Sequence, residues 1–234
     1  MLTAGARVGY TAGEMPTPLH LTRVRFLPEL YPVEDRYPFN LAVLRETPEV
    51  RFTTPVTIFV GENGCGKSTL LEAVARRCGI HIWTPEYITR MEHNPHEEKL
   101  HLFMGVEWSN GSVPGAFFSA RIFRTFAEMT EAVAAHDPGQ LRYYGGKSLI
   151  SQSHGQSLLS YFGARYKLRG LYFLDEPETA LSPRSQLELL RIVRDMAADG
   201  HAQFLISTHS PILLACPGAT LYSLDESPIR PITY

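Results

Sequence analysis

Cysteine, long apolar runs and an excess of one charge are all scarce in this sequence of 234 residues. The three cysteines, Cys65, Cys78 and Cys216, form no C-x-x-C pair, which argues against a zinc site or a disulfide framework. Isolated thiols suit a reducing compartment. We therefore expect a cytoplasmic protein.

Membrane insertion and broad nucleic-acid affinity are also disfavoured. No stretch approaches the ~18 consecutive apolar residues that span a bilayer, and residues 1–23 lack the apolar segment of a signal peptide. The formal net charge is −2, so the chain has no overall basic surface of the kind that marks many nucleic-acid binders. We expect no membrane insertion.

Length and composition fit a single domain over residues 1–234. Hydrophobic residues make up 44% and charged residues 20%, which is ordinary for a globular protein with one good-sized core. Residues 1–18 contain three glycines and two prolines, and we expect them to form a loose lead-in. The sequence contains no internal repeats and no heptads.

The strongest positive signal is the segment 61–69, G-E-N-G-C-G-K-S-T, which fits G-x-x-x-x-G-K-[ST]. It follows an apolar strand predicted at 56–60 and precedes a helix predicted at 68–78. Backbone N–H groups and a helix N-terminus then point at one spot, which suits a phosphate chain. The alternative is a glycine-rich turn that matches by chance. The expected phosphate-binding residues are Gly61, Glu62, Asn63, Gly64, Cys65, Gly66, Lys67, Ser68 and Thr69.

Within this loop, two side chains have separate roles. Lys67 supplies a point charge to the outer phosphates, and the Ser68 hydroxyl faces a magnesium ion that keeps several waters.

Two further apolar strands end in polar residues. The strand at 170–175 ends in Asp175, which can hold the magnesium through water, and Glu176 follows as a candidate general base. The strand at 204–207 is followed by His209, which can bond a terminal phosphate or the attacking water. The alternatives are an acidic turn for the carboxylates and a structural histidine.

Taken together, these motifs resemble an ABC-type ATPase over nearly the whole chain: Walker A at 61–69, hhhhDEP at 171–177 and the switch histidine, His209. The resemblance implies an α/β fold with a mainly parallel core sheet, flanking antiparallel strands and a helical subdomain at about 115–168. It also implies ATP and Mg²⁺ as cofactors, and a homodimer in the ATP-bound state.

A fourth segment, Ser153-His154-Gly155-Gln156, resembles the S-G-G-Q core of the family signature, with a histidine in place of one glycine. It precedes a helix predicted at 157–166. The resemblance implies that Ser153, Gly155 and Gln156 bind the nucleotide held by the partner subunit. The alternative is a polar linker before a helix.

Within this class the chain resembles the small stand-alone AAA-family and SMC-like ATPases more than transporter subunits. The third motif reads T-H-S-P, and the usual D-loop aspartate is missing. The glutamine that relatives place between Walker A and the signature is also missing, since no glutamine occurs between Lys67 and Gln140. Ser119 or Arg121 are the candidate substitutes.

Three functions remain open on this reading. The first is an ATPase whose hydrolysis at a head-to-tail dimer interface is coupled to a partner protein or a nucleic acid. The second is a nucleotide-dependent binding switch with little turnover, and the third is the nucleotide-binding subunit of an ABC transporter.

Several local elements complete the prediction. Tyr37 or Phe39 could stack on an adenine, although core packing is favoured for both. Strands are expected at 21–27, 41–44, 80–83, 101–108 and 221–224. A helix at 123–135 is expected to present Phe126, Met129 and Val133 on one face, and a helix capped by Ser182 is expected to present Leu187, Leu190, Val193 and Ala197.

Overall fold

The computed structural model describes residues 19–83, 94–137, 139, 141, 142, 146, 148, 149, 154–165 and 167–234, with the backbone alone at 122, 124, 154 and 165. The predicted lead-in at 1–18 and the signature residue Ser153 lie outside the described residues.

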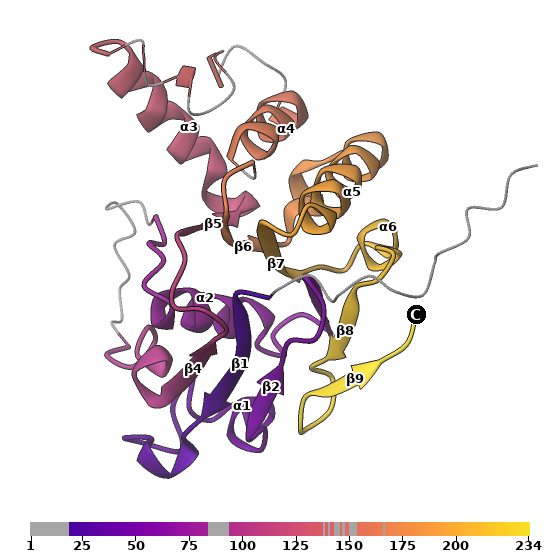
Figure 1. Ribbon diagram of the computed structural model, residues 1–234. Helices are drawn as coiled ribbons and strands as arrows, with labels where there is room; N and C mark the ends of the chain where they lie inside the picture. Colours follow the sequence, from indigo (N-terminus) through magenta and orange to yellow (C-terminus); the bar gives the residue numbers. More distant parts are fainter. Residues whose placement is uncertain are drawn as a thin grey trace, which may run out of the picture.

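A six-stranded sheet in the order β5-β6-β7-β3-β8-β9 forms the centre of the molecule (Figure 1). Every neighbouring pair is parallel except β8 and β9. The sheet confirms the predicted α/β fold with a mainly parallel core. Its strands are β3 (Val56–Val60), β5 (Gly115–Ser119), β6 (Gly170–Asp175), β7 (Ala202–Ser207), β8 (Thr220–Ser223) and β9 (Arg230–Ile232).

A second, three-stranded antiparallel sheet flanks the core in the order β2-β1-β4, as predicted. It consists of β1 (Leu21–Phe26), β2 (Glu49–Arg51) and β4 (Met104–Trp108). The buried Gln203 on β7 joins the two sheets, because its side chain accepts from the Leu21 N–H at 2.8 Å and donates to the Leu21 carbonyl at 2.9 Å.

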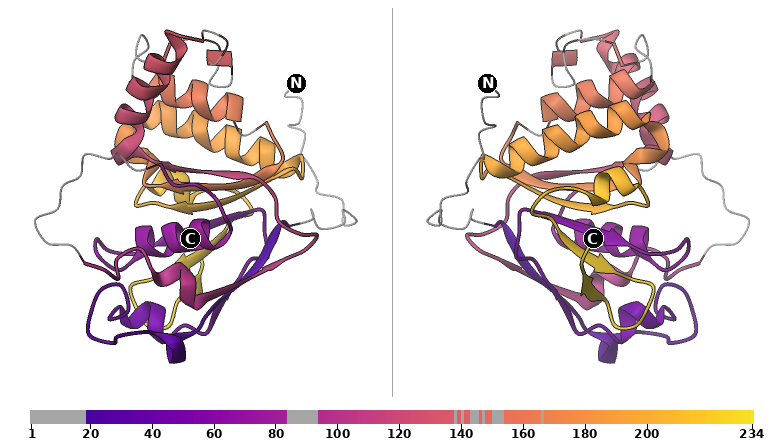
Figure 2. Two further views of the ribbon diagram at one scale, coloured as in Figure 1. Left: turned by 90° about the vertical axis from the view of Figure 1, so that its left-hand side faces the viewer. Right: turned by 90° about the vertical axis from the view of Figure 1, so that its right-hand side faces the viewer.

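Helices cover the central sheet on both faces (Figure 2). On one face lies α2 (Lys67–Arg77), between the two sheets, where it contacts β4, β6 and β7. On the other face lie α3 (Ala120–Ala134), α4 (His154–Arg165) and α5 (Pro183–Ala198). Short helices connect the layers: η1 (Pro28–Leu30), α1 (Ala42–Arg45), η2 (Leu100–Phe103), η4 (Pro177–Ala180) and α6 (Pro211–Leu214).

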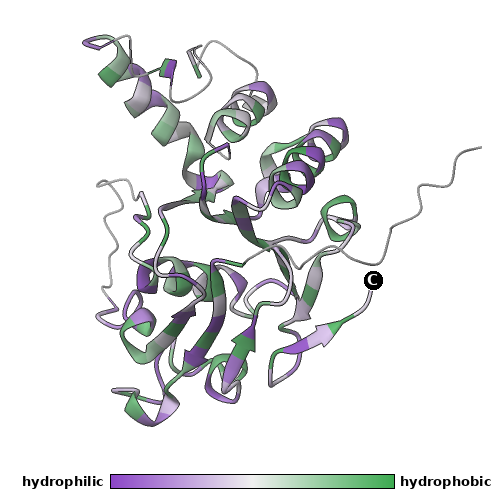
Figure 3. Cartoon of the chain, in the orientation of Figure 1, coloured by the Kyte–Doolittle hydropathy of each residue, from purple (hydrophilic) through white to green (hydrophobic). Residues whose placement is uncertain are grey.

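The central strands are apolar on both sides because both faces are covered. Along β6, Leu171 and Phe173 pack into the cluster around α2, whereas Tyr172 and Leu174 pack into the cluster beneath the three helices. Figure 3 shows these strands as hydrophobic between more polar helices. The alternation fixes the register, since a one-residue slip would exchange the two faces.

Helix ends follow the expected capping chemistry. Ser182 caps α5, as predicted, by accepting from the Ser185 N–H at 3.3 Å, and Pro183 occupies the first turn, where its missing N–H costs nothing. Helix α2 ends at Arg77, and Gly79 follows its C-cap with a φ of 73°, the left-handed conformation that glycine adopts readily.

Two predicted strands are wrong. Residues 42–45 form the short helix α1, because a single turn buries both Val43 and Leu44 in the core cluster. Residues 80–83 form no strand. The Ile80 N–H closes the end of α2 on the Ala75 carbonyl, and the Ile80 side chain lies directly against the Gly115 backbone. The strand predicted at 101–108 begins only at Met104, after η2.

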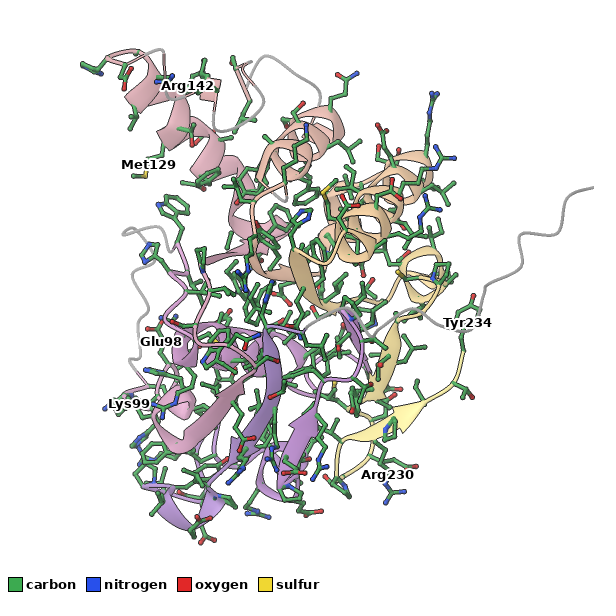
Figure 4. All side chains as sticks on the ribbon, viewed as in Figure 1. Glu98, Lys99, Met129, Arg142, Arg230 and Tyr234 are labelled. Atoms are coloured by element: carbon green, nitrogen blue, oxygen red, sulfur yellow. The ribbon has the colours of Figure 1, made fainter. Side chains whose placement is uncertain are left out.

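The predicted apolar face of α3 is wrong at two of its three residues, since only Phe126 packs inward, against Tyr161. Met129 and Val133 are 53% and 48% exposed, and Figure 4 shows Met129 on the outer side of the helix. The buried face carries Phe123, Ala127 and Ala134 instead. Small side chains at two of these positions let α3 lie close to its neighbours, so the larger residues are left outside.

Helix α5 repeats the same error at one position. Leu187 is 49% exposed, whereas the neighbouring Leu189 is fully buried and shares a face with Val193 and Ala197. Both leucines fit a helical period, so the pattern alone could not separate them.

Candidate functional site

Four strands bring polar residues to one edge of the central sheet. Parallel pairing aligns Ser119 on β5 with Asp175 on β6, and Asp175 with Ser207 on β7. Ser207 in turn pairs with Phe59 on β3, and the glycine-rich loop follows β3 directly. The carboxyl ends of parallel strands in an open α/β sheet form the usual position of a ligand site.

The glycine-rich loop has a backbone that tolerates few side chains. Gly66, at the N-terminus of α2, has a φ of 106°, and a Cβ there would lie 3.2 Å from the Leu41 side chain. A Cβ on Gly61 would lie 2.6 Å from the Cys65 sulfur. The loop is therefore a close-fitting cradle, and its N–H groups lead into a helix N-terminus, where an anion is stabilised.

Lys67 is buried in this cradle, with 4% of its surface exposed. Its Nζ donates to the carbonyls of Gly61 at 2.7 Å and Glu62 at 2.8 Å. Both acceptors are neutral, so these bonds do not cancel the charge of the ammonium group. A buried cation that is held by two carbonyls and, at 3.9 Å, the Cys65 sulfur fits an anionic ligand.

Ser68 and Asp175 meet across 107 residues of sequence. The Ser68 hydroxyl donates to Asp175 Oδ1 at 2.8 Å, and the Ser207 hydroxyl donates to the same oxygen at 2.6 Å. Asp175 is only 5% exposed. A hydroxyl and a carboxylate side by side are hard oxygen donors of the kind that Mg²⁺ uses. These residues therefore fit a magnesium ion.

Glu176 has the only non-glycine positive φ in the described part of the chain, at 47°. Such a conformation costs on the order of 1 kcal/mol or more and is concentrated at functional sites. It is held in place by the Glu176 N–H, which donates to the Ser207 carbonyl at 3.1 Å. The Glu176 side chain is 35% exposed, so water can reach it.

His209 lies beside Glu176. Its Nε2 is 3.6 Å from Glu176 Oε1, and its ring is 41% exposed. The His209 N–H donates to Glu178 Oε1 at 2.6 Å, which fixes the backbone of the histidine. Glu176 and His209, the two candidate reacting groups, therefore lie side by side next to Asp175, and water can reach both.

Three supporting residues were missed by sequence reasoning. Ser207 and Glu178 lie inside segments already singled out, and Ser207 could have been found by aligning the ends of neighbouring strands. No sequence pattern pointed to Asp225. It follows β8 and accepts from the Glu62 N–H at 2.7 Å, and thereby braces the glycine-rich loop from the far end of the chain.

The signature-like segment lies elsewhere. Helix α4 begins at His154 and not at the predicted Ser157, so Gly155 and Gln156 occupy its first turn. Gly155 faces the start of α5, where a Cβ would lie 3.3 Å from the Ser185 hydroxyl. Helices α4 and α2 lie on opposite faces of the sheet (Figure 2), so one chain does not bring these residues to its own glycine-rich loop.

The two aromatic candidates for base stacking separate clearly. Phe39 is fully buried and packs against Phe103 at 5.4 Å, which is the favoured core role. Tyr37 is 38% exposed and its hydroxyl bonds the Thr69 hydroxyl at 2.7 Å, beside the phosphate loop. Tyr37 therefore stays a candidate for contact with a base.

In its fold and in the order of its strand-end motifs the chain resembles the class of ABC-type P-loop ATPase domains, and it shares this fold with an SMC head domain.

Comparison with known proteins supports this class at both ends of the site. Residues 139–215 match the family described as "AAA domain, putative AbiEii toxin, Type IV TA system". Residues 39–76, which include the glycine-rich loop, match a family described as "AAA domain".

Two curated relatives match most of the chain at low sequence identity. The chain is 26% identical over 198 residues to the cobalt import ATP-binding protein CbiO of Salmonella typhimurium, covering 75% of this chain and 69% of the relative. It is 26% identical over 167 residues to the thiamine import ATP-binding protein ThiQ of a Ruegeria species, covering 65% of this chain and 69% of the relative.

Solved structures share the fold. The SMC head domain from Thermotoga maritima superposes with a TM-score of 0.51 at 14% identity, covering 92% of this chain and all of that one. CbiO1 from Clostridium perfringens, part of a transporter complex, gives 0.53 at 16% identity, covering 90% and 87%. Within the described residues, no helix has the length and apolarity needed to cross a membrane.

Proposed function

We propose that this protein is an ATP hydrolase whose active sites form between two copies of the chain. The observation that carries the proposal is the bond from Ser68 to Asp175 next to the Glu176–His209 pair, at the end of a phosphate-binding loop. Magnesium held there would offset the negative charge of the phosphate oxygens.

Each residue of the site then has a task. Lys67 and the loop N–H groups bind the outer phosphates, and Ser68 and Asp175 hold the metal. Glu176, exposed to water and beside His209, orients and deprotonates the attacking water. His209 donates to the terminal phosphate. Tyr37, bonded to Thr69, supplies a face for the adenine.

The second half of the site comes from a partner in this proposal. Gly155 and Gln156 lie in the first turn of α4, on the far side of the sheet from α2. A helix N-terminus stabilises negative charge, so α4 of one copy, together with Ser153, completes the phosphate site of the other. The chain works in the cytosol as a homodimer that ATP closes and hydrolysis opens.

Mixing two inactive variants tests the shared site. Lys67→Ala disables the phosphate loop, and Gly155→Asp disables the signature helix. A heterodimer of the two holds one intact site, so a 1:1 mixture should recover about a quarter of parental turnover. A mixture as inactive as its components would contradict the shared site, provided that both variants melt like the parent.

A substitution at Glu176 tests hydrolysis separately. Glu176→Gln should lower steady-state ATP turnover by about a hundredfold or more while ATP still binds. The trapped ATP should then hold a dimer, which light scattering after gel filtration detects. Unchanged turnover would remove Glu176 from the reaction.

A specific observation favours each of the two alternative functions. A binding switch with little turnover is favoured by Ser119, a candidate substitute for the missing glutamine, which lies at the strand end beside Asp175. A transporter subunit is favoured by the similarity to the import ATP-binding proteins. Turnover measured alone, with single-stranded DNA, double-stranded DNA or RNA separates an ATPase coupled to nucleic acid from a switch, and co-purification with a membrane protein would support the transporter.

A further inference from the structure

A pocket of about 230 Å³ lies along β5, which is the edge strand of the central sheet. All five residues of β5 line it. They belong to both faces of the sheet, since Phe117 packs into the cluster around α2 and Phe118 into the cluster beneath the helices. A pocket that touches both faces of an edge strand lies along its free edge. The other walls come from α3, α4 and the segment after α2 (Figure 1).

Aromatic rings form most of these other walls. The ring centroid of Phe126 lies 6.2 Å from that of Trp83 and 5.7 Å from that of Tyr161, and both contacts are edge-to-face. Phe118 and Phe123 extend the cluster, with their centroids 5.6 Å apart. Aromatic rings pack best in offset-stacked or edge-to-face pairs, so these walls favour a planar aromatic ligand.

The strand edge adds backbone donors and acceptors. The Leu171 N–H donates to the Pro114 carbonyl at 3.0 Å, and bonds in a parallel ladder recur at every second residue. Ala116 and Phe118 therefore turn their backbone groups toward β6, whereas the N–H and C=O of Phe117 point to the free edge. Neither group of Phe117 has a hydrogen-bond partner among the described residues.

Ser119 supplies a buried hydroxyl at the end of the same strand. The residue lines the pocket and is 6% exposed, and no described residue bonds its hydroxyl. His81, in the segment after α2, adds ring nitrogens to the lining. A buried polar group that is left without a partner costs about 1–3 kcal/mol. The pocket therefore favours a ligand that carries both donors and acceptors.

We propose that this pocket binds a planar two-ring nitrogen heterocycle of the purine type. An apolar cavity of about 150 Å³ holds one benzene ring, so a pocket of about 230 Å³ suits two fused rings and is too small for a drug-sized ligand. The faces of the heterocycle pack against Phe126 and Trp83, and its edge bonds the Phe117 backbone and the Ser119 hydroxyl. None of the lining residues belongs to the glycine-rich loop, so this site is separate from the proposed ATP site.

Fluorine NMR tests the proposal at the pocket itself. Trp108→Phe leaves Trp83 as the only tryptophan, so labelling with 5-fluorotryptophan gives one resonance, from the wall of the pocket. Saturating Mg²⁺ and the non-hydrolysable β,γ-imido analogue of ATP fill the proposed ATP site. Adenine should shift this resonance with a Kd below about 1 mM. Indole, a two-ring compound with one donor and no acceptor, should bind about tenfold more weakly.

Two variants and a control place the ligand. Ser119→Ala removes the buried hydroxyl and should weaken adenine binding by about fivefold. Ala116→Leu adds three carbons to the lining and should abolish the binding of adenine. Ala219→Leu, at another half-buried alanine of the same cluster but outside the pocket, should leave the affinity unchanged.

The source of the ring is identified with adenosine and a single-stranded oligodeoxyadenylate, each at low and high salt. Only binding of the nucleic acid should weaken steeply as the salt concentration rises. A shift of the Trp83 resonance by either compound supports the site.

Three results would overturn the proposal. Adenine at about 5 mM, well above the expected Kd, may not leave the Trp83 resonance unmoved. Indole that binds as tightly as adenine would rule out recognition of a nitrogen heterocycle, and adenine binding that survives Ala116→Leu would place the ligand outside the pocket. If the imido analogue does not bind while adenine still shifts the resonance, the proposed ATPase function falls and this site stands.

Discussion

The layer that carries α2 and the layer that carries α3, α4 and α5 cover opposite faces of one sheet, but they are held by different interactions. Around α2, side-chain hydrogen bonds link segments far apart in sequence, from Ser68 to Asp175 and from Glu62 to Asp225. In the helical layer, aromatic side chains pack together, with Phe118, Phe123 and Tyr161 in mutual contact.

The difference shows which half of the site one chain can build alone. The glycine-rich loop, Ser68 and Asp175 are held by hydrogen bonds within the chain. The helical layer leaves Met129, Val133 and Leu187 exposed on its outer surface. It packs on the sheet through apolar side chains, whereas directional hydrogen bonds hold the residues around α2.

The largest expected effect concerns the helical layer itself. Phe123→Ala removes a ring that is 3% exposed from the aromatic cluster and should lower the free energy of unfolding by about 3–5 kcal/mol. Met129→Ala, six residues along the same helix, should change it by no more than about 0.5 kcal/mol. Urea unfolding followed by circular dichroism measures both.

Comparable losses at the two positions would mean that the outer face of α3 is covered, for example in a dimer. Repeating the measurement over a range of protein concentrations shows whether that cover is a second chain, since only then does the loss at Met129 depend on concentration.

How far the sequence predicts the molecule also differs between the layers. The strands before the loop, Asp175 and His209 could be predicted because continuous β-branched and aromatic runs mark buried parallel strands, and their polar ends mark the site edge. The three strand ends meet as expected, because parallel pairing places the carboxyl ends of neighbouring strands at the same edge of the sheet.

The failures came from contacts between distant segments. No local pattern says that Ala127 packs inward and Met129 outward, because this depends on how closely α3 lies to the sheet. Nor does a pattern show that Asp225 would brace a loop 163 residues earlier. Short apolar runs such as 41–44 fit a strand or a helical turn equally well, and the surrounding core decided the outcome.

The rates at which the cysteines are alkylated offer a second comparison of the two layers. Burial raises the pKa of Cys78, at the end of α2, to about 12 and that of Cys216, in the cluster beneath the helices, to about 11. The thiolate is the form that reacts, so at about pH 8 both should react with iodoacetamide slowly. Cys65, in the glycine-rich loop, should react faster than either.

Mass spectrometry of digested peptides gives the order, and the signs can be checked by raising the pH. Labelling of Cys216 should increase as the pH approaches its pKa, before labelling of Cys78 does. Saturating ATP should slow labelling of Cys65 alone. Protection of Cys78 or Cys216 to the same degree would show that nucleotide tightens the whole fold and does not simply cover the loop.

The smallest expected effect tests how firmly the loop around α2 is held. Asp225→Ala removes the acceptor for the Glu62 N–H but leaves every proposed ligand-binding residue in place. Asp225 is exposed, so the bond contributes about 1 kcal/mol and ATP affinity should fall by about fivefold. Asp199→Ala, at the exposed end of α5, is the matched control and should leave the calorimetric affinity unchanged. An Asp225 variant that binds ATP as tightly as the parent would mean that the glycines and the buried Lys67 hold the loop without help from the C-terminal strands.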